Sequence, residues 1–428
     1  MVAYFLIFIF VALIILWLVL GKSEGNSNQR RFKDMPELKT DHLSHFQQMQ
    51  EGDDLDLPES EFLSPDNSSE LLNDPTQVPY TFGEQNEFMQ GEVDENVTVE
   101  EVQVFKGHED WVTCVDFTHD GRLLASGGAD GNVILWDMTT GKKQHVIKVN
   151  EVGVESIAFS HDSEYFATGG ADGEVKIWSL EELKEVRSFG GAPYGVNRVM
   201  FSMDKRYLAT HAGTALRLWD LETLRKIHTR SKHEANVKSI CLSPDGNLVA
   251  LGGTEGTIEL WDLKQDKERD SLMGSLRAGA VVDLAFSPEG LQLASSSGSR
   301  SIYIWDLSSG RPTASIRGKG SGTYNMKFHP DGNIIVAWGK STEIELWDSN
   351  YGTLICVLKG HGNWVLNVAF SPNGHLMASC GRDNVIRIWG INAQPEDLAP
   401  FQAAAMAEDQ LDEEELTEDI EEESPIEF

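Results

Sequence analysis

From about residue 97, the chain alternates between short apolar runs and polar turn signals. Asp-Gly pairs such as Asp120-Gly121 and Asp130-Gly131 separate runs of four to seven residues. Runs of this length between Asp-Gly turns predict antiparallel strands joined as hairpins. In the first unit, the strands are expected at Val112 to Phe117, Leu123 to Ser126, Val133 to Trp136 and Lys143 to Val149.

A tryptophan ends the third strand of each unit, and the unit repeats seven times. The steps between these tryptophans are 42, 41, 42, 44, 42 and 42 residues. A period of this size is typical of four-stranded propeller blades, so residues 97–392 are expected to form an all-β propeller with seven blades. The tryptophans are Trp136, Trp178, Trp219, Trp261, Trp305, Trp347 and Trp389.

The seventh unit stops after its third strand, Val385 to Trp389. A strand is available at the start of the repeats, where Val99 to Phe105 alternates apolar and polar residues. Pairing these two segments would remove the exposed sheet edges of an open ring. The sequence therefore predicts that the N-terminal strand completes the last blade, which makes a monomeric ring.

Residues 1–21 predict a membrane anchor. Val2 to Leu20 is almost wholly apolar, and no charged side chain lies between Met1 and Gly21. A helix of this length spans most of the ~30 Å hydrocarbon core of a bilayer. A cleaved signal peptide is the alternative, but it usually has a basic start and an apolar run of roughly 7–15 residues.

The charges after this segment predict its orientation. Bases follow it at Lys22, Arg30, Arg31, Lys33 and Lys39, and no basic side chain precedes it. The positive-inside tendency then places the propeller in the cytoplasm, as part of a single-pass membrane protein. Residues 22–96 are rich in acids and proline and predict a disordered linker.

The formal charge of −33 comes almost entirely from the flanks. Residues 40–105 hold 17 acids and residues 392–428 hold 14, and neither segment contains Lys or Arg. Such polyanionic flanks argue against nucleic-acid binding, which needs clustered bases. We expect the tail over 393–428 to be solvated and disordered or transiently helical, and a docking tail for a basic partner is the alternative.

The repeats resemble the WD40 family over about Val97 to Gly390, because five of the seven tryptophans precede Asp and Gly-His pairs open the first and last units. The resemblance implies a buried tetrad of Trp, Ser or Thr, His and Asp in each blade. Blade two has Asn150 at the His position, and blade four has His233 but Leu251 in place of the hydroxyl. Two blades carry the full set, which is His108, Ser126, Asp130 and Trp136 in blade one and His361, Ser379, Asp383 and Trp389 in blade seven.

No residue pattern indicates an enzyme. His108, Ser126 and Asp130 have the residue types of a catalytic triad, but a serine inside a strand is expected to be buried and to serve the network. No phosphate-binding glycine loop and no metal-ligand spacing is present, so we expect no cofactor and no metal.

The resemblance also implies protein binding on the face where loops lead into the innermost strands. Exposed Trp, Tyr and Arg are common interface anchors, although a tryptophan here can also simply pack beside its loop. We expect a membrane-tethered, non-catalytic scaffold; the alternative is a regulatory subunit or nucleotide-exchange factor for a membrane GTPase or transporter. The candidate partner-binding residues are Asp110, Trp111, Tyr194, Lys319, Trp364 and Arg382.

Overall fold

The computed structural model describes residues 97–401, apart from 191–194, 214, 224, 231–236, 266, 270–271, 273–278, 299–300 and 319–323. The chain divides into two units, Met1–Pro79 and Tyr80–Phe428, and all described residues lie in the second. The predicted anchor, Met1 to Gly21, and the predicted linker therefore lie outside the described residues. Between residues 97 and 401, no helix is long and apolar enough to cross a membrane.

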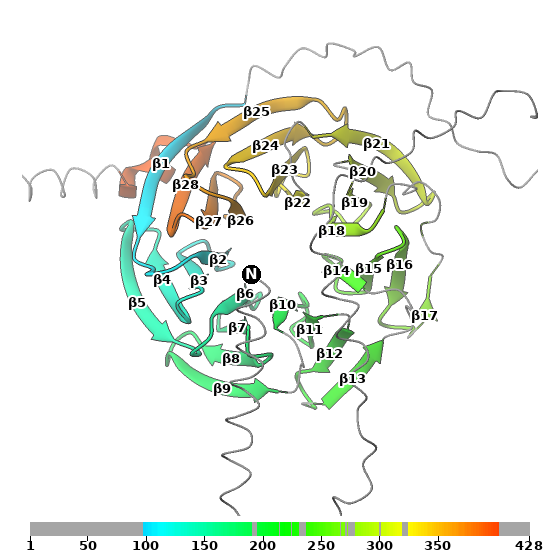
Figure 1. Cartoon of the computed structure of the whole chain (residues 1–428), viewed down its shortest axis with the longest axis horizontal. Helices are drawn as coiled ribbons and strands as arrows, with labels where there is room; N and C mark the ends of the chain where they lie inside the picture. Colours follow the sequence, from blue (N-terminus) through cyan, green and yellow to red (C-terminus); the bar gives the residue numbers. More distant parts are fainter. Residues whose placement is uncertain are drawn as a thin grey trace, which may run out of the picture. The chain divides into compact units, whose positions relative to one another are not determined.

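The described strands form seven antiparallel sheets of four strands each, arranged radially around a common centre (Figure 1). The seven-bladed propeller predicted from the sequence is confirmed. The innermost strands are β2 (Val112–Phe117), β6 (Val154–Phe159), β10 (Val196–Phe201), β14 (Val237–Leu242), β18 (Val281–Phe286), β22 (Tyr324–Phe328) and β26 (Val365–Phe370).

The second strand of each blade is the most buried, because both of its faces pack against neighbouring blades. The second strands are β3 (Leu123–Gly128), β7 (Tyr165–Gly170), β11 (Tyr207–Ala212), β15 (Leu248–Gly253), β19 (Gln292–Ser297), β23 (Ile334–Gly339) and β27 (Leu376–Gly381). The third strands carry the repeated tryptophans and are β4 (Asn132–Asp137), β8 (Val175–Ser179), β12 (Ala215–Asp220), β16 (Ile258–Asp262), β20 (Ser301–Asp306), β24 (Glu343–Asp348) and β28 (Val385–Ile391).

The outermost strands are more polar and more exposed, as in the alternating pattern of a solvated edge. They are β5 (Lys142–Lys148), β9 (Lys184–Phe189), β13 (Arg225–Arg230), β17 (Lys267–Glu268), β21 (Arg311–Arg317), β25 (Leu354–Lys359) and β1 (Val99–Lys106).

The ring closes as the sequence predicts. Strand β1 pairs antiparallel with β28, from Val99 opposite Ile391 to Lys106 opposite Val385, and completes the seventh blade. In Figure 1, β1 runs along the outer edge of the blade that contains β26, β27 and β28. Blades are numbered below from one (β2–β5) to seven (β26–β28 with β1), and the junction of blades seven and one is called the seam.

The core consists of seven hydrophobic clusters, one between each pair of neighbouring blades in the described chain. In the apolar cluster between blades seven and one, Phe105 stacks on Trp136 with ring centroids 4.7 Å apart. This burial of large apolar side chains between sheets is the main stabilising contribution to the ring.

A helix over residues 395–401 adds to the seam. The sequence places the start of a disordered or transiently helical tail at residue 393, whereas the structure packs this part of the chain on blade seven. The carboxylate of Asp397 accepts a hydrogen bond from the Gln394 amide (2.9 Å) and contacts His375 (2.7 Å). At the end of the helix, Phe401 is 2% exposed and packs against Phe105. Residues 402–428 lie outside the described residues.

Candidate functional site

Blades one and seven each contain one continuous chain of four polar side chains. In blade one, Asp130 Oδ2 lies 2.9 Å from His108 Nδ1, and Ser126 Oγ lies 2.8 Å from His108 Nε2. The indole of Trp136 donates to the same serine oxygen at 2.9 Å. The structure thus brings together all four residues that the sequence assigns to this blade.

The corresponding distances in blade seven are almost the same. His361 contacts Asp383 at 2.8 Å and Ser379 at 2.7 Å, and Trp389 donates to Ser379 Oγ at 2.8 Å. Ser379 and its equivalent Ser126 are both 0% exposed. Because each hydroxyl is buried and already bonded on two sides, these groups stabilise the blade and do not meet a substrate.

The electrostatics of the two tetrads fit this structural role. Desolvation lowers the pKa of His108, although the nearby Asp130 carboxylate opposes the shift. Burial of Asp383 acts to raise its pKa, but the His361 side chain and the Gly362 amide outweigh this, so the pKa lies below its usual value. The carboxylates therefore stay ionised where they hold the histidines and the loop amides.

The other blades keep parts of the tetrad. Trp178 donates to Thr168, Trp219 to Thr210 and Trp305 to Ser295, so the indole–hydroxyl bond survives in blades two, three and five. In blade six, Trp347 donates instead to Glu345 Oε2 at 3.2 Å. Asn150, at the histidine position of blade two, bonds the Gly153 backbone, Leu251 of blade four is buried, and His233 lies outside the described residues.

Three of the candidate partner-binding residues meet at the seam. The guanidinium carbon of Arg382 lies 4.1 Å from the ring centroid of Trp111 and 4.3 Å from that of Trp364. The ammonium of Lys340 lies 5.6 Å from the Trp364 ring. These four residues, Trp111, Lys340, Trp364 and Arg382, are called the seam cluster below.

The tetrads position the two loops that carry these tryptophans. Asp130 Oδ2 accepts a hydrogen bond from the Glu109 amide at 3.0 Å, and Asp383 Oδ2 accepts one from the Gly362 amide at 2.8 Å. The carbonyls of both tryptophans accept backbone bonds, from Ala129 in blade one and from Arg382 in blade seven. The same loop geometry thus occurs on both sides of the seam, and a buried network holds each loop.

The turn of blade seven also contacts blade one directly. Asn384 adopts a φ of 64°, where the equivalent Gly131 has 76°, and asparagine tolerates this left-handed conformation better than most residues. The Asn384 side chain donates to the Glu109 carbonyl across the seam at 3.4 Å.

The remaining candidate residues fall into two groups. Asp110 is exposed and accepts a hydrogen bond from the Trp111 amide at 2.7 Å, while Trp111 itself is 41% exposed. Tyr194 and Lys319 lie outside the described residues. The sequence did not single out Lys340, which lies in the turn between β23 and β24 of blade six, beside the Trp364 loop of blade seven.

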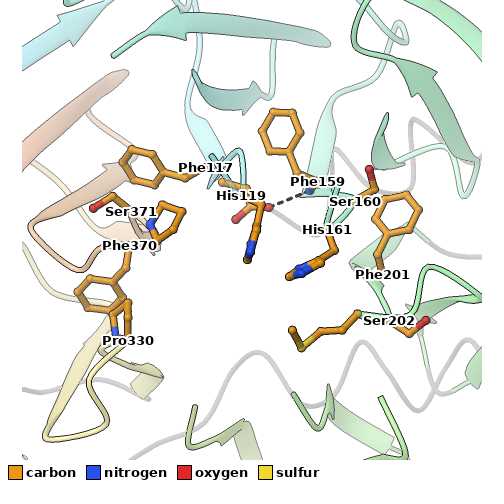
Figure 2. Close-up of a pocket in the computed structure, with 13 residues that line it drawn as sticks. Phe117, His119, Phe159, Ser160, His161, Phe201, Ser202, Pro330, Phe370 and Ser371 are labelled. Atoms are coloured by element: carbon orange, nitrogen blue, oxygen red, sulfur yellow. Dashed lines mark hydrogen bonds between the residues drawn. The ribbon is translucent and has the colours of Figure 1, made fainter. Parts of the chain in front are cut away.

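A cavity of about 340 Å³ lies on the opposite face, at the ends of the innermost strands (Figure 2). Figure 2 shows His119 and His161 side by side, and their ring centroids are 3.8 Å apart. Desolvation and the neighbouring His161 lower the pKa of His119. The walls include Phe117, Phe159, Phe201 and Phe370 together with serine and proline side chains. The residues of this cavity come from separate blades, so the repeat spacing along the sequence does not predict it.

Charged residues of the innermost strands link blades three to six, with Asp283 buried and Arg198 partly exposed. Arg198 of β10 pairs with Asp283 of β18 at 2.5 Å and also donates to the Ile240 carbonyl of β14. The other oxygen of Asp283 accepts the Met326 amide of β22 at 3.0 Å. We call this arrangement the channel link. In the sequence, this link is indicated by a charged residue at the third position of β10 and β18. The equivalent position is Cys114 in β2 and Ser156 in β6.

A second pair of opposite charges lies nearby. Burial raises the pKa of Asp116 and lowers the pKa of Lys327, and the opposite charge of each partly offsets these shifts. Within the described ranges, no group of three or more His, Cys, Asp or Glu side chains could hold a metal ion.

Comparison with known proteins agrees with this geometry. The family model "WD domain, G-beta repeat" matches residues 99–137, 141–179, 224–262, 269–306 and 352–390. Each match begins within two residues of the outermost strand of one blade and ends in the third strand of the next, which is the offset that lets β1 complete blade seven. The third strands of blades three and six fall outside the matched segments.

Curated relatives match over short segments. "Small ribosomal subunit protein RACK1y" of Oryza sativa subsp. japonica is 38% identical over 69 residues, which is 16% of this chain and 19% of that protein. "Small ribosomal subunit protein RACK1" of Schizosaccharomyces pombe is 38% identical over 63 residues, which is 15% and 20% of the two chains. "Serine-threonine kinase receptor-associated protein" of Gallus gallus is 49% identical over 45 residues, which is 10% and 13%.

The match thus spans about a fifth or less of these relatives' length. The fold, the seven tryptophans and the matched repeats nevertheless point to one architecture: the chain carries WD40 repeats and folds as a seven-bladed β-propeller.

Proposed function

We propose that this protein is a non-catalytic scaffold that binds partner proteins through the face of the propeller that carries the seam cluster. The observation that supports this most is the stack of Arg382 between Trp111 and Trp364. Tryptophan and arginine are the residues that most often dominate binding energy at protein interfaces.

The surroundings of the cluster support the same function. Its loops are held by buried tetrads, so little conformational entropy is lost when a partner binds. The large exposed ring of Trp111 offers apolar area, and the exposed Glu109 and Asp110 form a polar rim. One similar protein is named for its association with a receptor. No feature of the residues that the structure describes favours a nucleotide-exchange factor over a scaffold.

Capture of partners by the immobilised full-length chain tests this proposal. Trp111→Ala combined with Trp364→Ala should remove most of the proteins captured from a cytosolic extract. Tyr165→Ala combined with Tyr351→Ala is the matched control, because both tyrosines are exposed and lie at turns on the opposite face.

Two further measurements make this test decisive. Thermal unfolding shows whether each variant is folded, and Trp111→Ala alone replaces the double variant if that variant does not fold. Capture that survives the tryptophan variants but is lost in the tyrosine variant would reject the proposed face.

We also propose that the scaffold is tethered to a membrane by Val2 to Leu20, with the propeller in the cytoplasm. This rests on the apolar run and on the bases that follow it. Protease protection on intact vesicles, with tags in residues 22–96 and in the C-terminal tail, tests it. We expect the protease to digest both tags without detergent. Protected tags would place the propeller on the other side of the membrane. Release of the chain from the vesicles by carbonate would reject the membrane anchor.

A further inference from the structure

The guanidinium of Arg382 lies against two indole rings at the seam. Its central carbon is 4.1 Å from the ring centroid of Trp111 and 4.3 Å from that of Trp364. Cation–π contacts of this kind hold a guanidinium in place but use none of its N–H donors.

No partner for these donors is present in the described part of the chain. The Arg382 side chain has no recorded hydrogen bond or ion pair, and its Nε is buried without an acceptor. The adjacent Asp383 uses its Oδ2 for His361 and the Gly362 amide, and its Oδ1 is buried without a hydrogen-bond partner, so neither oxygen pairs with Arg382. Only Nε is buried, so the terminal N–H groups of Arg382 are the donors that an incoming oxygen ligand can reach.

The charge around the stack selects the kind of ligand. Lys340 is exposed and lies over the Trp364 ring, and it also has no acidic partner among the described residues. Two cations without partners attract an anion. Glu109 and Asp110 are exposed in the loop of Trp111, and their charges disfavour a dianion such as a phosphate more than a single carboxylate.

We propose that Arg382 is the receptor for a carboxylate side chain of an acidic peptide segment in the partner protein. The fork of N–H donors matches the two oxygens of a carboxylate, and the tryptophans hold the fork in a fixed orientation before binding. This inference rests on the proposed function and adds the chemistry of the partner.

The chain itself provides a conservative variant for the test. Blades one and two have Ala129 and Ala171 at the position of Arg382, directly before the aspartate of the turn. Arg382→Ala therefore gives blade seven a residue that the same turn already accepts twice. Arg187→Ala is the matched control, because Arg187 is an exposed arginine on the outer strand β9.

The experiment measures the anisotropy of a fluorescein-labelled oligoglutamate peptide titrated with the full-length chain. The wild-type chain should bind this peptide about tenfold more tightly than its glutamine counterpart, a difference of about 1.4 kcal/mol. Arg382→Ala should remove the preference, Arg382→Lys should restore only part of it because an ammonium cannot form the fork, and Arg187→Ala should keep it.

Each contrary outcome has a separate meaning. Equal binding of the glutamate peptide by wild type and Arg382→Ala overturns the assignment of Arg382. Tighter binding of a phosphoserine counterpart than of the glutamate peptide overturns the choice of a carboxylate. If partner capture depends on Trp111 and Trp364 but glutamate is not preferred, this inference fails while the proposed function stands; if capture is independent of both tryptophans, the proposed function itself fails.

Discussion

Blades one and seven are held together in a different way from blades three to six. The two blades at the seam each contain a complete tetrad, and between them lie Phe105, Phe401 and the stacked Arg382. The middle blades keep only fragments of the tetrad and are joined through the channel link of Arg198 and Asp283.

The difference follows from how the ring closes. Middle blades follow one another in the chain, so each folds beside a neighbour that is already connected to it. The seam must instead join β1 to β28, and the paired residues are nearly three hundred positions apart in sequence, as the 294-residue separation of Thr98 and Asn392 shows. Closing so long a loop costs entropy, and the additional buried contacts at the seam offset that cost. The same networks also fix the loops that carry the seam cluster.

The largest expected effect comes from breaking the channel link. Arg198→Met removes the ion-pair partner of the Asp283 carboxylate, which is 4% exposed, and leaves only the more distant charge of Lys327. We expect the free energy of unfolding to fall by about 3 kcal/mol, because breaking a buried ion pair by removing one partner is costly. Chemical denaturation of the full chain measures this loss, and adding Asp283→Asn should recover part of it. No recovery in the double variant would mean that the link contributes by packing alone.

A smaller effect should separate the two kinds of blade. Ser379→Ala in blade seven leaves the Trp389 indole and His361 Nε2 without their shared partner, whereas Ser295→Ala in blade five leaves only the Trp305 indole. At about 1 kcal/mol or more for each buried group, the expected losses are about 2 and about 1 kcal/mol. Equal losses in the two variants, measured by the same denaturation, would contradict the special role of the complete tetrads.

The smallest effect is a dependence on pH. The pKa of His108 in the folded chain is depressed below its ordinary value of 6.5, so the unfolded chain binds a proton first as the pH falls. The contribution of His108 to the free energy of unfolding is therefore full above about pH 6.5. It decreases as the pH falls from there towards the lowered pKa, by at most about 1.4 kcal/mol per pH unit. The lowered pKa of Asp130 causes a further decrease in stability only below about pH 3.8.

The melting temperature between pH 7 and pH 5 measures this dependence. His108→Asn, which copies the residue at the equivalent position of blade two, should make the dependence shallower. His145→Asn is the control, since His145 is exposed on β5 and lies in no tetrad. If the melting temperature of His108→Asn falls with pH as steeply as that of the wild type, groups other than His108 cause the loss of stability in acid.

The sequence predicts the fold well because the repeat is strong. The tryptophan spacing, the Asp-Gly turns and the incomplete last unit are enough to predict seven blades and the pairing of Val99 to Phe105 with the last strand. Family patterns also identify the tetrad residues, since each position lies at a fixed offset from its tryptophan.

The sites between blades are harder to predict from sequence. The stack of Arg382 between two tryptophans, the pair of Arg198 and Asp283, and the contact of His119 with His161 each join residues from different blades. Repeat spacing shows which positions are equivalent but not which side chains lean across a blade boundary. For residues 393–428 the sequence predicts a disordered or transiently helical tail, so the packing of residues 395–401 on blade seven was not predicted.

The most direct test of partner binding at the seam is a map of lysine cross-links between the full-length chain and the proteins it captures. Lys106 and Lys340 lie on the face of the seam cluster, while Lys205 and Lys264 lie at turns on the opposite face. We predict cross-links to partners from Lys106 and Lys340, and their loss when Trp111 and Trp364 are replaced. Cross-links concentrated at Lys205 and Lys264 would show that partners bind the opposite face and would contradict the proposed function.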